Sequence, residues 1–509
     1  MECPFHQPWK VGSVEYEPVV TEIVAGPRWS AKGLDIAAGR YPLRVENHVS
    51  QMVDRLLPGV TTVTDHATYF ILHPLVWAEA KKRGLDLAAA RELIRRCEVV
   101  VAGVSALHGP HHLPVAHGED RIRPDLIESG VLRVSEVQQP GSYAAPEAGF
   151  FGAYRGSEER LGLLSPGSGG FDSPGGRFNE QIARRGMEGI FELAAQDEVR
   201  REVLESASNL CVCQAFQGSV GQALRTLLCA PDPSPDYRKL DSARQATARL
   251  IGRMLRRGPL SEMEGGFSKV IRSGSFIVQD PVASDILESR VWRGVALRNF
   301  TVGAWRRIWS LAVEQLDEPR SRYEIAERLA SEVGEGEVGD LLASLPESMD
   351  GDIVLDAEGE LRSQAPRRVD VEIALLALSA RRVDELDDET ARAYSPRPQE
   401  VLSPHWLKAY LTSRISDPMR TVVSDLVERL VDRAMRVALS KMETRPDGVV
   451  WLPTRVKERD GTLYRISTEG WGDVGLRIAS FSNVLASAGV LDWSQDGWTL
   501  SPKGESLIG

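Results

Sequence analysis

Residues 65–107 read DHATYFILHPLVWAEAKKRGLDLAAARELIRRCEVVVAGVSAL. Asp65 is a suitable helix cap, and the residues from Tyr69 to Trp77 form the strongly apolar body of a helix behind it. A further helix is expected from about Leu87 to Leu107, where Gly109-Pro110 ends it. Two apolar helices in direct succession predict a mainly α fold.

The same helical spacing recurs on both sides of this stretch. Upstream, Val45, Val49, Val53 and Leu56 lie at helical intervals, and Pro58-Gly59 stops the pattern. Downstream, the sequence predicts helices at residues 238–257, 281–298, 302–316, 368–380, 387–394, 418–442 and 475–488, with strand-like runs at 449–451 and 462–466. The expected fold is mainly α: a multidomain helical body with a small α+β C-terminal domain that resembles a winged helix.

The length of 509 residues indicates roughly three or four domains of about 150 residues each. Glycine and proline are dense between residues 109 and 180, which predicts a long loop-rich region. The expected units are an N-terminal helical domain (1–108), the Gly/Pro-rich loop region (109–180), a central helical domain with basic helices (181–320), a small helical insert with linker helices (321–400) and the C-terminal winged-helix-like domain (401–509).

The composition is ordinary for a globular protein, with 42% hydrophobic and 26% charged residues and a net charge of −11. An acidic chain has no general attraction to nucleic acid or anionic membranes, so such contact would need a local basic patch. The five cysteines follow no disulfide framework, and Cys211-Val212-Cys213 is a C-x-C, not a C-x-x-C redox pair. We expect free, mostly buried thiols in a reducing compartment.

Two features indicate a cytoplasmic protein without a membrane partner. The first residues, MECPFH, lack the basic and apolar regions of a signal peptide. No uninterrupted apolar run approaches the ~20 residues that a membrane helix needs, and the longest, Val99 to Leu107, is far shorter.

Two segments suit contact with nucleic acid. In residues 238–257, seven Lys or Arg residues stand against one acid, Asp241, which gives a local charge of +6. Several of these arginines recur at i, i+4 and i+7, so they fall on neighbouring helical faces and can track phosphates. The second segment, Arg290 to Trp309, interleaves five arginines, Arg298 among them, with three tryptophans, a combination that suits stacking on single-stranded bases.

These segments supply the candidate nucleic-acid-binding residues, with DNA as the favoured ligand: Arg244, Arg249, Arg253, Arg256, Arg257, Arg293, Arg306 and Arg307. A structural interpretation stands beside this one. A charge run is usually a solvated face, tryptophans at helical spacing usually belong to a core, and arginines can pair with the many acids of this chain.

The C-terminal segment combines a helix with a hairpin. Leu476 to Ala488 carries an apolar stripe, and Asp496-Gly497 between two apolar runs is a hairpin-turn signal. A helix followed by a two-stranded wing resembles a winged helix-turn-helix, which contacts DNA through the helix and the wing. The alternative is a winged helix used for packing against protein.

Four of the nine histidines lie close together, next to Glu119 and Asp120: His108, His111, His112 and His117. Converging ligands of this kind can hold a metal ion for hydrolysis, although the spacing matches no zinc signature and the segment is expected to be a polar surface loop. We therefore assign no cofactor and no catalytic residue. The sequence contains no phosphate-binding loop, no G-x-S-x-G elbow and no H-E-x-x-H motif. The common enzyme classes that use these motifs are therefore less favoured.

The N-terminal hundred residues contain four short motifs: Gly33-Leu34-Asp35, then Leu57-Pro58-Gly59 followed by Val60 to Thr64, then Ala67-Thr68-Tyr69-Phe70, and finally Arg95-Arg96-Cys97-Glu98. In these motifs the chain resembles the opening of a group of uncharacterised bacterial proteins associated with defence loci against phage and plasmids. The resemblance implies a role in defence. It implies no catalytic residues.

The favoured interpretation is a non-catalytic helical subunit of a bacterial defence assembly, which binds nucleic acid, a partner effector, or both. One alternative is a metal-dependent hydrolase or nuclease that uses the histidine and acid residues of positions 108–120. The other is a transcriptional regulator that acts through the winged helix.

Overall fold

The computed structural model describes residues 34–108, 115–135, 149–230, 235–346, 358–359, 361 and 368–509. Over these residues the protein is mainly helical, and its short strands form five small sheets. The mainly α fold that the helical spacing predicts is therefore confirmed. None of the described helices combines the length and the hydropathy that a membrane crossing requires.

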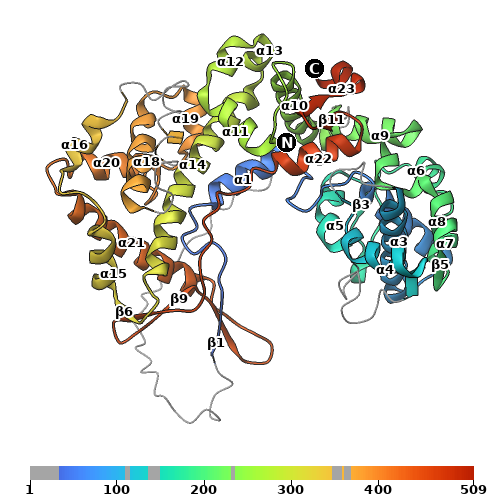
Figure 1. Ribbon diagram of the computed structural model, residues 1–509, viewed down its shortest axis with the longest axis horizontal. Helices are drawn as coiled ribbons and strands as arrows, with labels where there is room; N and C mark the ends of the chain where they lie inside the picture. The colour runs from blue at the N-terminus through green and yellow to red at the C-terminus, as the bar shows by residue number, and fades with distance from the viewer. Residues whose placement is uncertain are drawn as a thin grey trace, which may run out of the picture.

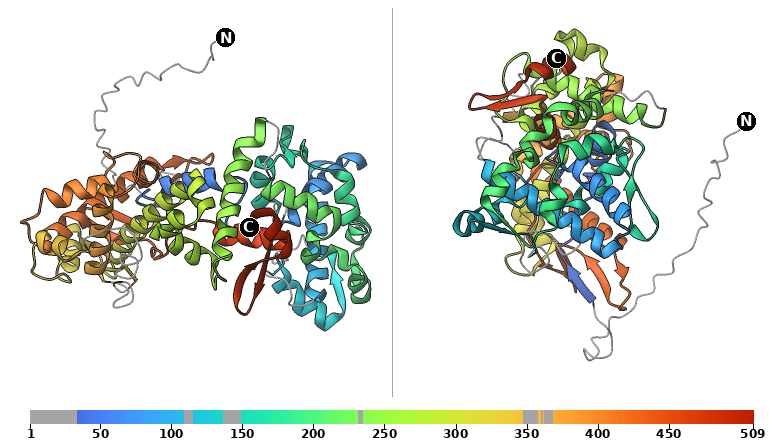
Figure 2. Two further views of the ribbon diagram at one scale, coloured as in Figure 1. Left: turned by 90° about the horizontal axis from the view of Figure 1, so that it is seen from above. Right: turned by 90° about the vertical axis from the view of Figure 1, so that its right-hand side faces the viewer.

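The helices form an arch with two arms (Figure 1). Seen from above, the two arms again lie at opposite ends of the molecule (Figure 2). The first arm is built from the N-terminal part of the chain: α2 (Tyr69–Arg83), α3 (Leu87–His108), α4 (Glu119–Ser129), α5 (Phe151–Arg160), α6 (Glu180–Gly186), α7 (Ile190–Ala194), α8 (Arg201–Ser206), η3 (Ser208–Leu210), η4 (Val212–Phe216) and α9 (Gly218–Cys229).

The crown of the arch joins segments that are far apart in sequence. It contains α1 (Asn47–Leu56), α10 (Pro235–Leu255), α11 (Met263–Ser273), α12 (Ser275–Gln279), α13 (Pro281–Asp285), α22 (Ile478–Ser487) and α23 (Pro502–Ile508). The second arm contains α14 (Leu287–Glu314), α15 (Arg322–Ala330), α16 (Val338–Ser344), α18 (Val369–Arg381), α19 (Asp388–Tyr394), α20 (Pro404–Thr412) and α21 (Met419–Ser440).

Short strands tie distant parts of the chain together. β1 (Leu34–Ala37) pairs in parallel with β8 (Val450–Pro453), which also pairs with β7 (Glu443–Thr444). A second sheet has the order β6 (Arg320–Ser321), β10 (Thr462–Arg465) and β9 (Val456–Arg459). The remaining pairs are β2 (Val131–Arg133) with β5 (Glu198–Arg200), β3 (Leu164–Ser165) with β4 (Ser173–Pro174), and β11 (Leu491–Ser494) with β12 (Gly497–Leu500).

α14 is the central helix of the second arm and is buried over most of its length. It packs against α1, α11, α18 and α19. Its side chains Trp292, Trp305 and Trp309 are in the core, and the indole nitrogens of Trp292 and Trp305 donate to Thr247 Oγ1 and to the carbonyl of Leu402. These rings are therefore not exposed for stacking on bases, and the structural interpretation of the tryptophans is confirmed.

The expectation of two helices at 281–298 and 302–316 is wrong. α13 ends at Asp285, and α14 then runs without interruption from Leu287 to Glu314. Residues 298–302 carry no proline or glycine that would break the helix, so it continues through them. The described part of the 109–180 region, expected to be loop-rich, contains α4 and α5 in addition to β3 and β4.

The C-terminal helix and hairpin are present. β11 and β12 pair with Ser494 opposite Gly497, so the turn consists of Gln495 and Asp496, one residue earlier than expected. α22 lies against α11, η4 and β11, and most of its side chains are buried. The chain between residues 401 and 509 is spread over both the second arm and the crown.

Candidate functional site

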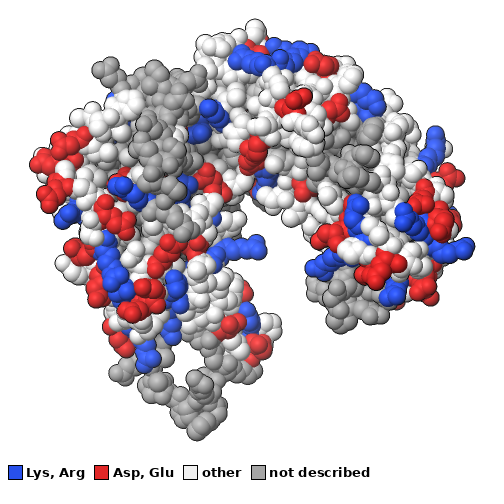
Figure 3. Space-filling view, viewed as in Figure 1, with Lys and Arg blue, Asp and Glu red and all other residues white. Residues whose placement is uncertain are grey.

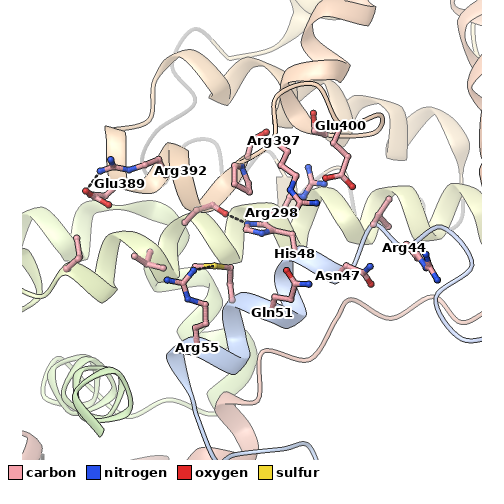
Figure 4. A pocket seen from close by; sticks show the side chains of 18 residues that line it. Arg44, Asn47, His48, Gln51, Arg55, Arg298, Glu389, Arg392, Arg397 and Glu400 are labelled. Atoms are coloured by element: carbon pink, nitrogen blue, oxygen red, sulfur yellow. Dashed lines mark hydrogen bonds and ion pairs between the residues drawn. The ribbon is translucent and has the colours of Figure 1, made fainter. Parts of the chain in front are cut away.

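A cavity of about 560 Å³ lies where the crown meets the second arm (Figure 4). Its walls are one side of α1 along its length, the first half of α14, α19 and the segment that follows α19. The lining residues are Arg44, Val45, Asn47, His48, Gln51, Met52, Arg55, Leu287, Val291, Arg298, Glu389, Arg392, Ala393, Ser395, Pro396, Arg397, Glu400 and Ser403.

The cavity carries an excess of positive charge. Five arginines line it, Arg44, Arg55, Arg298, Arg392 and Arg397, against the two carboxylates of Glu389 and Glu400. Counting the histidine as neutral, five minus two leaves a charge of +3 in a chain whose net charge is −11.

Both carboxylates already have arginine partners. Glu389 pairs with Arg392 on the same helix, and Glu400 lies 3.6 Å from Arg433 of α21, which is not a lining residue. Among the described residues, no ion pair engages Arg44, Arg55, Arg298 or Arg397. These four guanidinium groups therefore give the cavity its electrostatic character.

Among these arginines, Arg298 most strongly indicates a binding site. It projects from α14 beside the cavity, and the residue is 4% exposed (Figure 4). Its Nε and Nη1 atoms are buried and have no hydrogen-bond partner among the residues that the structure describes. Burial lowers the pKa of the guanidinium, while Tyr394 and Glu400 oppose this shift and Arg433 adds to it. A buried charge without a partner costs several kcal/mol of folding free energy. An anion bound beside Arg298 would offset part of this free-energy cost.

A second buried polar group on the cavity wall also lacks a partner. Ser395 is 5% exposed, and its hydroxyl makes no hydrogen bond with any described part of the chain. Native structures leave few buried polar groups unsatisfied, and each of them calls for an explanation. Arg298 and Ser395 are therefore two buried polar groups on the wall of the same cavity that lack a hydrogen-bond partner among the described residues.

α1 adds polar side chains to the cavity wall. Asn47, His48 and Gln51 of α1 line the cavity. The N-cap of α1 is Glu46, a buried acid that pairs with Arg306, so the positive end of this helix already has a carboxylate beside it. Arg44, three residues before α1, has a φ of 53°, a left-handed conformation that costs a non-glycine residue free energy.

His48 connects two walls of the cavity. Its Nε2 lies 2.6 Å from the carbonyl oxygen of Ala393 at the end of α19, so Nε2 donates and the neutral ring keeps Nδ1 as an acceptor. Burial lowers the pKa of His48, although the hydrogen bond to Ala393 opposes the shift.

The basic segment on α10 is largely paired within the protein. Arg244 is 1% exposed and donates to Asp241 and to the carbonyls of Pro58, Leu227 and Leu228. Arg253 binds Asp280 at 2.9 Å, and Arg256 binds Glu505 at 2.7 Å. Arg249 and Arg257 are exposed and have no acidic partner among the described residues, although Arg257 covers the ring of Phe276.

The candidates on α14 are paired or buried as well. Arg293 is buried and its Nε donates to the carbonyl of Arg272. Arg306 pairs with Glu46, and Arg307 pairs with Glu372 and Asp473. None of the eight predicted nucleic-acid-binding arginines lines the cavity. Lysine and arginine side chains do gather over the crown, mixed with acidic ones (Figure 3).

The described residues of the predicted histidine cluster each contact different partners. His111 and His112 lie outside the described residues. His108 is 3.1 Å from Cys213, whereas His117 stacks on Phe150 and its Nε2 is 3.0 Å from the hydroxyl of Tyr154. Glu119 is buried, pairs with Arg123 and accepts a hydrogen bond from the backbone of Ala116.

A different histidine, His73 of α2, is fully buried between two carboxylates. Its Nδ1 is 2.7 Å from Glu158 of α5, and its Nε2 is 3.0 Å from Glu98 of α3. Burial alone would lower the pKa of His73, but the two carboxylates outweigh it and raise the pKa to about 9. Since all three side chains are inaccessible to solvent, this charged triad links three helices and offers no site for a substrate.

The sequence does not predict this cavity, and none of its five arginines is among the predicted binding residues. Arg298 was noted within the 290–309 segment, but the other four arginines lie at positions 44, 55, 392 and 397, and no spacing connects them. The signal that could have singled out Arg298 is its place between Leu297 and Phe300 in an otherwise apolar part of the helix. Comparisons with protein-family models, with curated proteins and with solved structures found no match.

Proposed function

We propose that this chain is a helical binding protein that takes a phosphate-bearing ligand into the cavity around Arg298. The observation that carries this proposal is the buried guanidinium of Arg298, whose Nε and Nη1 have no partner on the wall of a cavity with excess positive charge. A ligand phosphate would supply the missing acceptors.

The kind of cation favours phosphate over a single carboxylate. All the basic side chains of fixed charge that line the cavity are arginines. The planar guanidinium presents its donors as a rigid fork that matches phosphate oxygens in pairs, which a lysine ammonium cannot do. Four arginines without an acidic partner exceed what one carboxylate needs and suit an anion with two or more charges.

The size and the remaining walls of the cavity favour a nucleotide. Small-molecule sites measure about 300–1,000 Å³, and this cavity falls within that range. Met52, Leu287 and Val291 provide an apolar surface beside the charged one. A nucleotide has the same division, with its phosphates at one end and its base at the other. The nucleotide could be free in solution or could be the phosphorylated end of a nucleic acid strand.

Calorimetric titration tests the proposal and separates the two sources. The ligands are pyrophosphate, ATP, adenosine, and one single-stranded oligonucleotide with and without a 5′-phosphate. Binding of pyrophosphate and ATP would indicate a free nucleotide, while selective binding of the phosphorylated oligonucleotide would indicate a strand end. Equal binding of adenosine and ATP, or binding of none of the ligands at low salt, would contradict phosphate recognition.

For the wider role we propose a non-catalytic subunit of a bacterial defence assembly: the resemblance supports defence, and the lack of catalytic motifs in the sequence favours a non-catalytic subunit. In such an assembly the cavity would hold a nucleotide or strand end, and the β11–β12 hairpin would be the exposed part of a winged-helix-like element. Expression of the chain with its genomic neighbours, followed by phage challenge, tests this role. Protection that survives loss of Arg298 would separate the role from the cavity.

A further inference from the structure

Three sulfur and nitrogen ligands converge at the C-terminal end of α3, outside the cavity that contains Arg298. They are His108, the last residue of α3, and the two cysteines that flank Val212 at the start of η4. The Sγ of Cys213 is 3.1 Å from His108 Nδ1 and 3.2 Å from Cys211 Sγ. The three ligand atoms all lie within 4.8 Å of one another.

The backbone between the two cysteines is fixed on both sides. The N–H of Val212 donates to Ser105 Oγ of α3 at 3.2 Å, and the carbonyl of Val212 accepts from Thr68 Oγ1 at 3.1 Å. Ser105 and Thr68 are themselves buried. The C-x-C segment is therefore held against the end of α3 in a register that brings both sulfurs to one place before any ligand binds.

We propose that His108, Cys211 and Cys213 form a zinc-binding site. In a tetrahedral Zn²⁺ site, Zn–S bonds of ~2.3 Å and Zn–N bonds of ~2.0–2.1 Å place neighbouring ligand atoms about 3.5–3.8 Å apart. The separations at this cluster reach that spacing by small movements of side chains, because the backbone of Val212 is already in position. Two thiolates and one imidazole are ligands that Zn²⁺ accepts readily, and the thiol protons pass to solvent on binding.

The burial of the ligands leaves the site open on one side. Cys211 is buried, Cys213 is half-buried and His108 is exposed. A metal ion can therefore enter from solvent, and a water molecule can complete its coordination. Since α3 and η4 would share the ion, zinc would also join the end of the longest helix of the first arm to the segment that leads into α9.

The experiment uses the full chain, reduced and freed of metal. Zinc content after dialysis and Co²⁺ absorption report binding, and the thiolate-to-cobalt charge-transfer band reports sulfur ligation. We expect one equivalent per chain, a charge-transfer band, and a melting temperature that rises with zinc, because a ligand that binds the folded state stabilises it. His108→Gln and Cys213→Ser should each abolish stoichiometric binding and the rise in melting temperature.

Cys229→Ala is the matched control, since Cys229 is a buried cysteine of α9 that is not among the three ligands. His108→Gln changes an exposed side chain, so the variant keeps the fold and isolates the ligand. Retention of one zinc by His108→Gln and Cys213→Ser would overturn the proposal. Failure of the reduced wild-type protein to bind Zn²⁺ or Co²⁺ would overturn it equally.

Discussion

His48 Nε2 lies 2.6 Å from the carbonyl oxygen of Ala393, and this hydrogen bond joins α1 to α19 across a span of 345 residues. The two residues also line the cavity that contains Arg298. The contact therefore holds two walls of the proposed ligand-binding cavity at a fixed distance from each other.

We expect His48→Ala to weaken ligand binding with little effect on overall stability. This hydrogen bond lies within the protein and contributes about 1 kcal/mol to its stability, so its loss can weaken ligand binding by at most roughly fivefold. Calorimetry with pyrophosphate measures the change. His405→Ala on α20 is the control, because His405 is not a lining residue. An unchanged affinity in His48→Ala would show that the two walls need no such connection.

Removal of the Arg298 charge should not destabilise the protein. Arg298 is buried without a hydrogen-bond partner for Nε and Nη1, so Arg298→Met removes a desolvated charge and retains much of the side-chain volume. Replacing a buried charge by a well-packed apolar residue is often neutral or stabilising. We expect the free energy of unfolding, measured by chemical denaturation, to stay the same or rise.

Arg244→Met is the matched comparison. Arg244 is equally buried, but its guanidinium donates to Asp241 and to three carbonyls. Its loss removes this donor from the three carbonyls and leaves Asp241 paired with Arg177, so we expect a destabilisation of about 3–5 kcal/mol. If Arg298→Met were as destabilising as Arg244→Met, Arg298 would be a structural residue and not one reserved for a ligand.

The triad of His73, Glu98 and Glu158 predicts a loss of stability at alkaline pH. The folded state raises the pKa of His73 from the usual value of 6.5 to about 9. The stabilisation is therefore complete below pH 6.5 and disappears as the pH rises through 9. Its size is on the order of 3 kcal/mol, because one pKa unit corresponds to ~1.4 kcal/mol.

Denaturation of wild type and His73→Gln at a series of pH values between 6 and 10 measures this effect. The variant should be less stable at pH 7 and should lose less stability than wild type on the alkaline side. Parallel pH profiles of the two proteins would contradict the charged state of His73.

Contact between nucleic acid and the basic segment 238–257 remains a prediction. The structure reduces the arginines available for this contact to those that are exposed and have no acidic partner. Arg249 and Arg257 are exposed without an acidic partner among the described residues, whereas Arg253 and Arg256 are engaged by Asp280 and Glu505. If α10 tracks a phosphate backbone, Arg249→Glu with Arg257→Glu should weaken DNA binding and flatten its dependence on salt. The slope of log affinity against log salt changes by ~0.9 for each phosphate contact. If the double variant bound DNA as well as wild type, these two arginines would not be part of the DNA-binding surface.

The helices could be predicted because their signals are local. The apolar repeat of Val45, Val49, Val53 and Leu56 lies within α1, and the run from Met419 to Ser440 forms α21 close to the expected bounds. The prediction was wrong where it placed a break inside α14, since charged residues such as Arg298 interrupted the apolar pattern without breaking the helix.

The sites could not be predicted in the same way, because tertiary contacts assemble them. Arg44 and Arg397 meet at one cavity although more than three hundred positions separate them, and His108 meets Cys213 across 105 positions. For the eight predicted nucleic-acid-binding arginines, the sequence shows the pattern but not the tertiary contacts. Their spacing is visible in the sequence, but their burial and their pairing with acids such as Asp280 and Glu372 depend on contacts with other parts of the fold.

Titration of pyrophosphate into wild type and Arg298→Met tests the central claim most directly, with the exposed Arg249→Met as a control for general loss of charge. The proposed site predicts salt-sensitive binding by wild type, no detectable binding by Arg298→Met and unchanged binding by Arg249→Met. Equal binding by wild type and Arg298→Met would show that the unpaired guanidinium of α14 is not where the anion binds.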